Sequence, residues 1–473
     1  MLLSNLYKSI NIKKTYNFKN NNVFKSITSN SKFTNKNTIF VYDFNSKVKT
    51  KYIKEAIQNK VPAIITNKYI KITTVPQFIV SNINLEIEEL LKQIYKNLPN
   101  KTIAITGTNG KTSVVWYISK ILTLLNYNNS SLGTIGYFEN NIKKYEVNLT
   151  TPAYEEIYKY GSLNKKKDNI FIFEASSHAL DQNRLRNYPV DIAAITNISD
   201  DHLDYHKNML NYKKAKYKLF TKYLLKQGSA VINSRIKNIT ELKNKLLKNK
   251  IKLMLFGNNY VSLKEKEGKI ILKINKKNYK LNKLKLKTDI EYENLECAIA
   301  IILELNIKIK KIIPIISKIT NPPGRLQKLN FDKKKSVIII DYAHTPDALK
   351  KTLIALKRKS KKPVLVFGCG GERDKNKREK MGQIAKKYAS RVYITDDNPR
   401  NENPYKIRRS ILKHCPDAVE ISSRKKAIKK ALNELKIEEI LLIAGKGHEK
   451  FQIIKNKKIK FDDYEIAKNI IKQ

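Results

Sequence analysis

A glycine-bearing turn, Gly107-Thr108-Asn109-Gly110-Lys111-Thr112, separates an apolar run at residues 102–106 from a second apolar run at residues 113–125. The first run has the length of a buried strand and the second that of a helix. Glycines let backbone N–H groups approach phosphate oxygens, and a helix N-terminus favours bound anions. Lys111 would reach the terminal phosphates, and the Thr112 hydroxyl would ligate magnesium. Two residues rather than the usual four separate the glycines, so a turn that arises by chance, or one like that of a dehydrogenase, is the alternative to a phosphate loop. The Lys-Thr pair at the start of the helix favours binding of a nucleoside triphosphate.

Two further polar turns follow apolar strands. Glu174-Ala175-Ser176-Ser177-His178 comes directly after the run IFIF, and a carboxylate at that place can hold Mg²⁺ beside the phosphates. Helix capping by the serines is the alternative interpretation of this turn. Residues 197–206, NISDDHLDYH, place two histidines among three aspartates. This composition favours a metal or phosphate role over a core or a solvated face.

The elements that must position these turns alternate strand and helix, which predicts an α/β protein with mainly parallel sheets. We expect a small N-terminal α/β domain at residues 1–97 and a central ATP-binding domain at residues 98–322. The segment NPPGRL marks a hinge. Beyond it, residues 323–473 repeat an apolar strand that runs into a polar turn, which predicts a doubly wound domain with ligands at the carboxyl ends of its strands. The lysine-rich stretch 248–287 alternates like a peripheral β-sheet.

The composition excludes some classes of protein. The chain carries 94 Lys and Arg against 42 Asp and Glu, a formal charge of +52, which in a patch would indicate nucleic acid or an anionic membrane. The lysines are instead spread over every expected element, so compositional drift is the preferred interpretation. We find no run of about eighteen uncharged apolar residues and expect no membrane span. Three scattered cysteines argue against a disulfide framework.

Taken in order along the chain, the motifs resemble those of the Mur ligases. The amino-terminal group comprises GTNGKT, EASSHAL, TNISDDHLDYH and Tyr212-x-x-Ala215-Lys216-x-x-Leu219-Phe220. The later group comprises GRL, DYAHTPD, GCGGERDKNK and AGKGHE. Together they are similar to the subfamily that adds the third amino acid to UDP-N-acetylmuramoyl-L-alanyl-D-glutamate. The resemblance implies a three-domain α/β architecture, with a central P-loop-type parallel sheet between the N-terminal and the doubly wound domain.

The resemblance also implies roles for residues around ATP. Lys216 matches a lysine that is carbamylated to N6-carboxylysine and binds a second magnesium ion, with Glu174 and His202 as its partners at the metal. Lys111, Lys216, Glu174 and His202 are then the catalytic group, and Thr112 belongs to the metal site. Further ATP contacts are implied for Asn294, Arg325, Asp341 and His344. The family often has a second asparagine where this chain has Cys297.

For the UDP-linked substrate, the resemblance implies contacts by Ser31, Thr150, Thr151, Ser176, Gln182 and Arg184. Arg184 also suits an anionic substrate as a fork-shaped donor. Ser31 is the weakest of these, because the N-terminal domain lacks the Asp-Ser-Arg-like element of the family and has Asn30-Ser31-Lys32 in its place.

Asp397-Asn398-Pro399-Arg400 resembles the signature of Mur ligases that add meso-diaminopimelate. Diaminopimelate differs from lysine by a distal carboxylate, for which Arg400 is a bidentate cationic partner. An ordinary proline turn with an exposed arginine is the alternative. Arg373, Gly445 and Glu449 match further diaminopimelate contacts, and Glu449 would suit the ammonium group.

The activity implied by the resemblance is ATP-dependent amide ligation in peptidoglycan precursor synthesis. The D-glutamate γ-carboxylate would take the γ-phosphate of ATP, and the amine of diaminopimelate would displace phosphate from that acyl phosphate. We expect two Mg²⁺ ions, small-molecule substrates, no specific nucleic acid, and a cytoplasmic monomer. Folylpolyglutamate synthase, which shares the central fold, is one alternative; a basic nucleic-acid-binding ATPase is the other.

Overall fold

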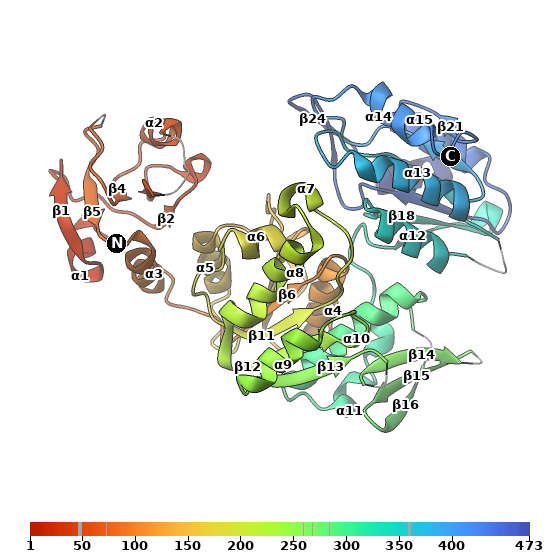
Figure 1. Ribbon diagram of the computed structural model, residues 1–473, viewed down its shortest axis with the longest axis horizontal. Helices are drawn as coiled ribbons and strands as arrows, with labels where there is room; N and C mark the ends of the chain where they lie inside the picture. The colour runs from red at the N-terminus through yellow and green to blue at the C-terminus, as the bar shows by residue number, and fades with distance from the viewer. Residues whose placement is uncertain (46–49, 72, 259, 267, 283, 358–360) are drawn as a thin grey trace.

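The computed structural model describes residues 1–45, 50–71, 73–258, 260–266, 268–282, 284–357 and 361–473. Within them the chain forms an α/β protein with three units, each built on its own main sheet. The N-terminal unit and the third, C-terminal unit lie on either side of the central unit (Figure 1). The α/β class expected from the sequence is confirmed. No helix in the described part of the chain has the length and apolar character that a bilayer crossing demands.

The N-terminal sheet has five strands in the order β1-β5-β4-β3-β2, of which only β1 runs antiparallel to its neighbour. Its strands are β1 (Ile12–Tyr16), β2 (Ser26–Thr28), β3 (Thr38–Tyr42), β4 (Ile64–Thr66) and β5 (Gln77–Val80). Its helices are α1 (Leu6–Ser9), α2 (Lys51–Gln58) and α3 (Ile83–Ile94). The apolar runs NTIFVYDF and VPAIITN supply β3 and β4, as their strand-like pattern predicts.

The central sheet has eight strands in the order β13-β12-β11-β6-β10-β7-β8-β9, and all except β8 and β9 are parallel. The parallel strands are β6 (Lys101–Thr106), β7 (Asn129–Gly133), β10 (Ile170–Glu174), β11 (Val190–Ile195), β12 (Leu224–Asn233) and β13 (Lys252–Phe256). The antiparallel pair is β8 (Gly136–Glu139) and β9 (Ile142–Tyr145).

Helices cover both faces of this sheet, which explains why its central strands are continuously apolar. Along β10, Phe171 and Phe173 face one buried cluster, and Ile170 and Ile172 face the other. The second face packs against α4 (Lys111–Leu124) and α10 (Asp289–Glu304). The first face carries α5 (Tyr154–Leu163), α6 (Ser177–Asp181), α8 (Met209–Lys218) and α9 (Thr240–Lys248), and the short helix α7 (Leu203–His206) packs against α8.

The lysine-rich stretch divides between two sheets. Its first strand, β13, joins the edge of the central sheet rather than a peripheral one. The remainder forms a three-stranded antiparallel sheet, as the alternating pattern predicts. Its strands are β14 (Ser262–Lys266), β15 (Lys269–Ile274) and β16 (Lys277–Leu281). The short helix α11 (Ile309–Ile312) then leads toward the hinge segment.

The third sheet has the order β17-β18-β22-β19-β20-β21, with β17 as its antiparallel edge. Its strands are β17 (Gln327–Phe331), β18 (Ser336–Asp341), β19 (Val364–Phe367), β20 (Val392–Ile394), β21 (Val419–Glu420) and β22 (Ile440–Ala444). Its helices are α12 (Pro346–Ala355), α13 (Asn376–Tyr388), α14 (Pro404–Leu412), α15 (Arg424–Asn433) and α16 (Asp463–Lys472). A hairpin, β23 (Phe451–Ile454) and β24 (Lys457–Lys460), precedes the last helix. The motif turns follow the carboxyl ends of β18, β19, β20 and β22, so one edge of the sheet gathers them.

A buried ion pair ties the last two helices of this unit to its central strand. The side chains of Arg424 and Asp463 are both fully buried, and the Arg424 Nη2 and Asp463 Oδ2 atoms lie 2.7 Å apart. The same guanidinium donates a second bond to Asp463 and a bond to the carbonyl of Ala444, at the end of β22. Since an unpaired charge in such a place is costly, both partners are needed.

We predict that Asp463→Asn lowers the stability of the third unit by roughly 3–5 kcal/mol, because it leaves the buried guanidinium without its counter-charge. Lys430→Met is the matched control, since Lys430 forms a half-exposed pair with Glu434 and should cost less than about 1 kcal/mol. Calorimetric unfolding of the two variants and the wild type measures both values. Equal losses in the two variants would show that the buried pair does not anchor the unit.

Candidate active site

A cleft of about 820 Å³ lies between the central and third units and gathers most of the residues that the sequence singles out. The ATP and metal candidates that line it are Thr108, Asn109, Gly110, Lys111, Thr112, Glu174, His202, Asn294, Arg325, Asp341 and His344. The substrate and amino-acid candidates that line it are Thr150, Thr151, Ser176, Arg184, Arg373, Asp397, Asn398, Arg400, Gly445 and Glu449. Residues from both halves of the chain thus face one space.

Five candidates lie outside the lining of this cleft: Gly107, Lys216, Gln182, Pro399 and Ser31. Gly107 and Pro399 sit within motif turns that do line it, and Gln182 accepts a hydrogen bond from Nε of Arg184 at 2.9 Å. Ser31 is buried in the N-terminal unit, where its hydroxyl donates to Glu55 Oε2 at 2.6 Å. The Ser31 hydroxyl therefore already has a partner.

The phosphate loop joins β6 to α4 and requires both of its glycines. Gly107 has φ +148° and Gly110 has φ +85°, and a Cβ on Gly110 would lie 2.1 Å from Oδ1 of Asn294. The Lys111 ammonium donates to the carbonyls of Gly107 at 2.8 Å and Thr108 at 3.0 Å, so the side chain folds back over the loop. Burial lowers the pKa of Lys111, against the opposing effect of the Glu174 carboxylate.

Asn294 reaches the cleft from α10, but Cys297, one turn further along, does not. Cys297 is fully buried in the cluster between α10 and the central sheet. Burial raises the pKa of its thiol. Cys297, which stands where the family often has a second asparagine, therefore packs in the core of this protein.

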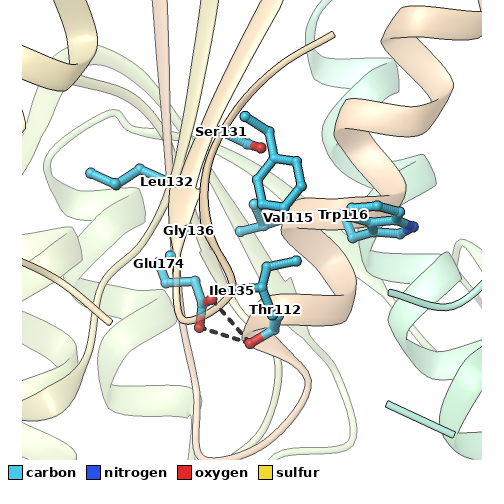
Figure 2. Close-up of a pocket in the computed structure, with 10 residues that line it drawn as sticks. Thr112, Val115, Trp116, Ser131, Leu132, Ile135, Gly136 and Glu174 are labelled. Atoms are coloured by element: carbon cyan, nitrogen blue, oxygen red, sulfur yellow. Dashed lines mark hydrogen bonds between the residues drawn. The ribbon is translucent and has the colours of Figure 1, made fainter. Parts of the chain in front are cut away.

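A buried carboxylate at the end of β10 meets the first turn of α4 (Figure 2). The Thr112 hydroxyl lies 3.0 Å from Oε1 and 3.1 Å from Oε2 of Glu174. Thr134, after β7, donates its backbone N–H to Oε1 at 2.8 Å and its hydroxyl to Oε2 at 3.1 Å. Carboxylate and hydroxyl oxygens are the hard ligands that Mg²⁺ prefers.

These residues fit magnesium only in combination with other ligands. Across the described residues, no group of three or more His, Cys, Asp or Glu side chains is close enough to hold a metal ion alone. Mg²⁺ characteristically takes one or two protein carboxylates and completes its shell with water and substrate phosphates. Glu174 and Thr112, beside the phosphate loop, match that pattern.

The histidine-rich turn packs two of its rings against His178, from the turn after β10. The ring centroids of His178 and His202 are 4.6 Å apart, and those of His178 and Tyr205 are 4.3 Å apart. Burial, followed by the neighbouring His178, lowers the pKa of His202 to about 3. His202 is thus neutral near pH 7, which is the protonation state of a metal-binding imidazole.

Lys216, on α8, is a buried lysine behind the phosphate loop. Its ammonium lies 4.4 Å from the ring centroid of Tyr212, whose hydroxyl is 3.0 Å from that of Thr108. Burial and then the charge of Lys111 lower the pKa of Lys216 well below its usual value. Its environment therefore favours the neutral amine.

The substrate candidates near Glu174 form a connected group. The Thr151 hydroxyl donates to the carbonyl of Glu174 at 2.7 Å and accepts from the backbone N–H of Ser176 at 2.9 Å. Nη1 of Arg184 donates to the carbonyl of Thr151 at 2.9 Å. The hydroxyls of Thr150 and Thr134 are 3.1 Å apart. The end of β10 thus positions the residues expected to contact the UDP-linked substrate.

The linker between the central and third units is the NPPGRL hinge segment, and its arginine, Arg325, contacts the phosphate loop. The Arg325 guanidinium lies 4.1 Å from the ring centroid of Tyr342, and its Nη2 donates to the Thr112 hydroxyl at 3.3 Å. Asp341 accepts backbone N–H bonds from Leu326 at 2.8 Å and Ala343 at 3.0 Å. These contacts fix the linker against the end of β18.

His344 follows β18 and lies within the same cleft. Its Nδ1 is 2.9 Å from the carbonyl of Tyr342. Burial, followed by the charge of Lys377, lowers the pKa of His344 to about 4. Its ring is neutral near pH 7, so it does not add a positive charge beside the phosphate loop.

Asp347 and Thr134 are residues of this site that the sequence analysis missed. Asp347, at the start of α12, accepts from Nδ2 of Asn109 at 3.2 Å and from the hydroxyl of Ser199 at 2.9 Å. It stands in the segment DYAHTPD, but only the fold shows that it crosses to the phosphate loop. Thr134 follows the glycine that ends the mostly polar strand β7, NSSLG, and nothing in that local pattern singles it out.

At the far end of the cleft, the turn 397–400 is held by side chains and by backbone pairing. Nη1 of Arg400 donates to the carbonyl of Gly371 at 2.8 Å, and the Arg400 backbone pairs with β23. Nδ2 of Asn398 donates to Oε2 of Glu449 at 2.8 Å. Gly445 has φ +110°, and a Cβ there would lie 3.2 Å from Oδ2 of Asp397. The turn therefore has the anionic and cationic groups that an amino-acid ligand needs.

Comparison with known families accounts for this arrangement. Residues 105–308 match the Mur ligase middle domain, and residues 324–447 match the Mur ligase, glutamate ligase domain. The chain belongs to the Mur ligase family. As a Mur ligase it is an ATP-dependent ligase, and the nucleotide fits the phosphate loop described above.

Named relatives of this Mur ligase extend over almost the whole chain. The UDP-N-acetylmuramoyl-L-alanyl-D-glutamate–2,6-diaminopimelate ligase of Rickettsia bellii is 40% identical, over 95% of this chain and 96% of the relative. A solved structure of a ligase of the same name is 27% identical with a TM-score of 0.62, over 95% of both chains. The similarity therefore includes the N-terminal unit, where the motifs are weakest.

The fold is also shared with a folate enzyme. Escherichia coli FolC in complex with DHPP and ADP has a TM-score of 0.59 at 17% identity, and the match covers 76% of this chain and 89% of that one. At that identity the likeness concerns the fold alone.

Proposed function

We propose that this Mur ligase joins meso-diaminopimelate to the D-glutamate γ-carboxylate of UDP-N-acetylmuramoyl-L-alanyl-D-glutamate. The observation that carries the proposal is the turn 397–400, with Arg373 and Glu449, at one end of the cleft whose other end is the phosphate loop. Relatives that are 35–40% identical over most of the chain are named as ligases for that substrate pair. The reaction belongs to peptidoglycan precursor synthesis.

The chemistry asks mainly for positioning and for stabilisation of negative charge. Lys111 and the N-terminus of α4 would hold the phosphates of ATP while the substrate carboxylate attacks the γ-phosphate. The acyl phosphate formed is then attacked by the amine, which leaves an amide, ADP and phosphate. Thr112, Glu174, His202 and a carbamylated Lys216 would hold two Mg²⁺ ions, which supply positive charge beside the transferred group.

The carbamate is supported by the state of Lys216. Only a neutral amine adds to carbon dioxide, and burial together with the charge of Lys111 lowers the pKa of Lys216 toward that form. The product is an anion, which the positive charge of the neighbouring Lys111 would stabilise. Its oxygens would add hard ligands of the kind that Mg²⁺ prefers.

The remaining binding roles follow the geometry of the cleft. Arg184, with Thr150, Thr151 and Ser176, would hold the muramoyl peptide next to Glu174, where its carboxylate must meet the γ-phosphate. Asn294, Arg325, Asp341 and His344 would enclose the nucleotide from the side of α10 and the linker. Ser31 and Gln182 remain candidates for substrate contact that lie away from the cleft lining.

Three domains, with boundaries at residues 97/98 and 322/323, would each bind a different substrate. The first would hold the UDP end, the second ATP, and the third the amino acid. We propose that the enzyme acts as a monomer in the cytoplasm, where ATP and nucleotide-linked precursors are available, without a specific nucleic-acid partner.

Phosphate release from ATP tests the proposal directly. We expect release that requires the muramoyl dipeptide and meso-diaminopimelate, with L-lysine a poor replacement. Release with L-lysine instead would keep the enzyme class and overturn the amino acid. Absence of release with either, from a protein that binds ATP, would contradict the proposed reaction.

Arg400→Ala should raise the KM for diaminopimelate by about 30- to 150-fold, because a charged hydrogen-bonded contact to its distal carboxylate is worth roughly 2–3 kcal/mol. The KM for ATP should change little. Arg409→Ala, which removes an exposed arginine of α14, is the matched control. Similar changes in both KM values would contradict the assignment of Arg400 to the amino acid.

Lys216→Ala should lower turnover by roughly 100- to 1000-fold, because it removes the proposed metal-binding carbamate, and bicarbonate should not restore activity. Lys214→Ala, an exposed lysine on the same helix, should stay close to wild type. Carbon-13 NMR of wild-type enzyme in labelled bicarbonate should show one carbamate signal that the alanine variant lacks. Near-normal turnover of Lys216→Ala would exclude the carbamate role.

A further inference from the structure

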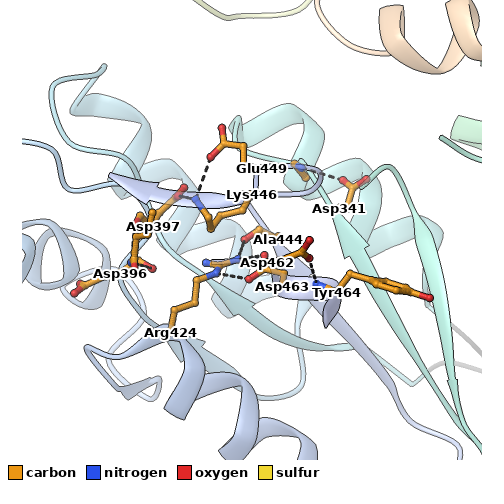
Figure 3. Close-up of polar contacts among 12 residues, drawn as sticks. Asp341, Asp396, Asp397, Arg424, Ala444, Lys446, Glu449, Asp462, Asp463 and Tyr464 are labelled. Atoms are coloured by element: carbon orange, nitrogen blue, oxygen red, sulfur yellow. Dashed lines mark hydrogen bonds and ion pairs between the residues drawn. The ribbon is translucent and has the colours of Figure 1, made fainter. Parts of the chain in front are cut away.

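A buried lysine, Lys446, lies against Asp397 and Glu449, two residues that line the amino-acid end of the cleft (Figure 3). We propose that Lys446 is a positioning residue that holds the Glu449 carboxylate in the orientation that receives the distal ammonium of the incoming amino acid. The inference rests on the proposed diaminopimelate function and deepens it. It assigns a selectivity role to a side chain that does not itself line the cleft.

Lys446 holds two residues of the site in one arrangement. Its side chain is fully buried, and its Nζ donates to Oδ1 of Asn398 and to Oε2 of Glu449, both at 3.0 Å. Nδ2 of Asn398 donates to the same Glu449 oxygen at 2.8 Å. The three side chains form a closed triangle, so the Glu449 carboxylate has one orientation. Oδ1 of Asp397 lies 3.7 Å from the same Nζ.

The backbone on both sides of Lys446 is fixed as well. The carbonyl of Ala444 accepts from Arg424, whose charge is balanced by Asp463. Gly445 and Gly447 both have positive φ, at +110° and +54°. In addition, a Cβ on Gly447 would lie 2.5 Å from the carbonyl oxygen of Gly324, which leaves no room for a shift toward the linker. The backbone before Lys446 is thus held by the Arg424–Asp463 ion pair, and the backbone after it by the close packing of Gly447 on Gly324.

The charges of this cluster do not cancel. Arg424 and Asp463 balance each other, whereas the one cation Lys446 stands against two carboxylates, Asp397 and Glu449. One negative charge is left over. Oδ1 of Asp397 is buried, and within the described residues it has no hydrogen-bond partner. A buried charge of this kind requires a counter-ion.

The surplus charge faces the ligand. Asp397 and Glu449 both line the cleft, and on the same wall lie the guanidinium groups of Arg373 and Arg400. Such a site suits a group that carries one ammonium and one carboxylate, which is the distal end of diaminopimelate. Lysine lacks the carboxylate, and 2-aminopimelate lacks the ammonium. Lys446 then orients the carboxylate that would receive the distal ammonium.

The test is steady-state phosphate release with wild type, Lys446→Met and the control Lys334→Met. Lys334 is a lysine of the same unit whose Nζ caps the carbonyls of Leu432 and Asn433, far from the cleft. We expect Lys446→Met to raise the KM for diaminopimelate about 30-fold, because Glu449 and Asn398 lose their shared donor. The KM values for ATP and the muramoyl dipeptide should stay within about twofold. Lys334→Met should leave all three unchanged.

A double-mutant cycle separates positioning from simple stabilisation. If Lys446 acts through Glu449, then Lys446→Met should add little to the KM effect of Glu449→Gln. Multiplicative effects, or an equal rise in all three KM values in Lys446→Met, would overturn the proposal. So would an unchanged KM for diaminopimelate in that variant.

A measurement on the wild-type enzyme covers the case in which Lys446→Met does not fold. With 2-aminopimelate, which keeps the reacting amine and the distal carboxylate, kcat/KM should fall at least about 100-fold relative to diaminopimelate. Equal use of the two would mean that the oriented Glu449 carboxylate does not recognise the distal ammonium, and would overturn the proposal. Lack of any diaminopimelate-dependent release by wild type would instead contradict the proposed function, so the two failures are distinguishable.

Discussion

The hydrogen bonds of the Glu174 carboxylate hold together the elements on which the rest of the site depends. One buried side chain joins the end of β10 to the first turn of α4 and to the loop after β7. The carbonyl of the same residue then receives the hydroxyl of Thr151, from the segment that leads to α5. A carboxylate with so many donors is fixed in direction, and each donor is fixed by it. The phosphate loop and the substrate segment are therefore both positioned by Glu174.

The site works by arranging a few buried charges, whereas most of the charge of the chain lies elsewhere. The formal charge of +52 comes mainly from lysines distributed over the whole sequence. Around the cleft a few buried charges act on one another: the Glu174 carboxylate opposes the lowering of the Lys111 pKa, and Lys446 forms an ion pair with Glu449. Buried charges interact more strongly than solvated ones, so these few pairs dominate the chemistry.

Much of this site was predictable from sequence because its residues follow apolar strands. A strand pattern ends where a polar turn begins, and parallel strands bring such turns to one edge. GTNGKT, EASSHAL and the turn 397–400 all met at the cleft for that reason. The α/β class and the strands beyond the hinge were predictable on the same grounds. The position of β13 in the central sheet was not, because a local sequence pattern does not show which strand it pairs with.

Other features depended on distance in space and could not be read from the local pattern. The burial of Lys216 and the packing of Cys297 in the core depend on which face of a helix meets the sheet. The contact of Asp347 with Asn109 joins residues 238 positions apart. The partner of Ser31, Glu55, likewise comes from a different element. In each case the residue type was compatible with several surroundings.

Arg325 belongs to the linker itself, and its guanidinium reaches the Thr112 hydroxyl while its neighbour Leu326 is bonded to Asp341. The orientation of the third unit and the state of the phosphate loop are therefore thermodynamically linked, and each must bias the other by the same free energy. A nucleotide or inhibitor that displaces the Arg325 guanidinium from the Thr112 hydroxyl would therefore lose the free energy of that contact, whereas one that leaves it in place would not.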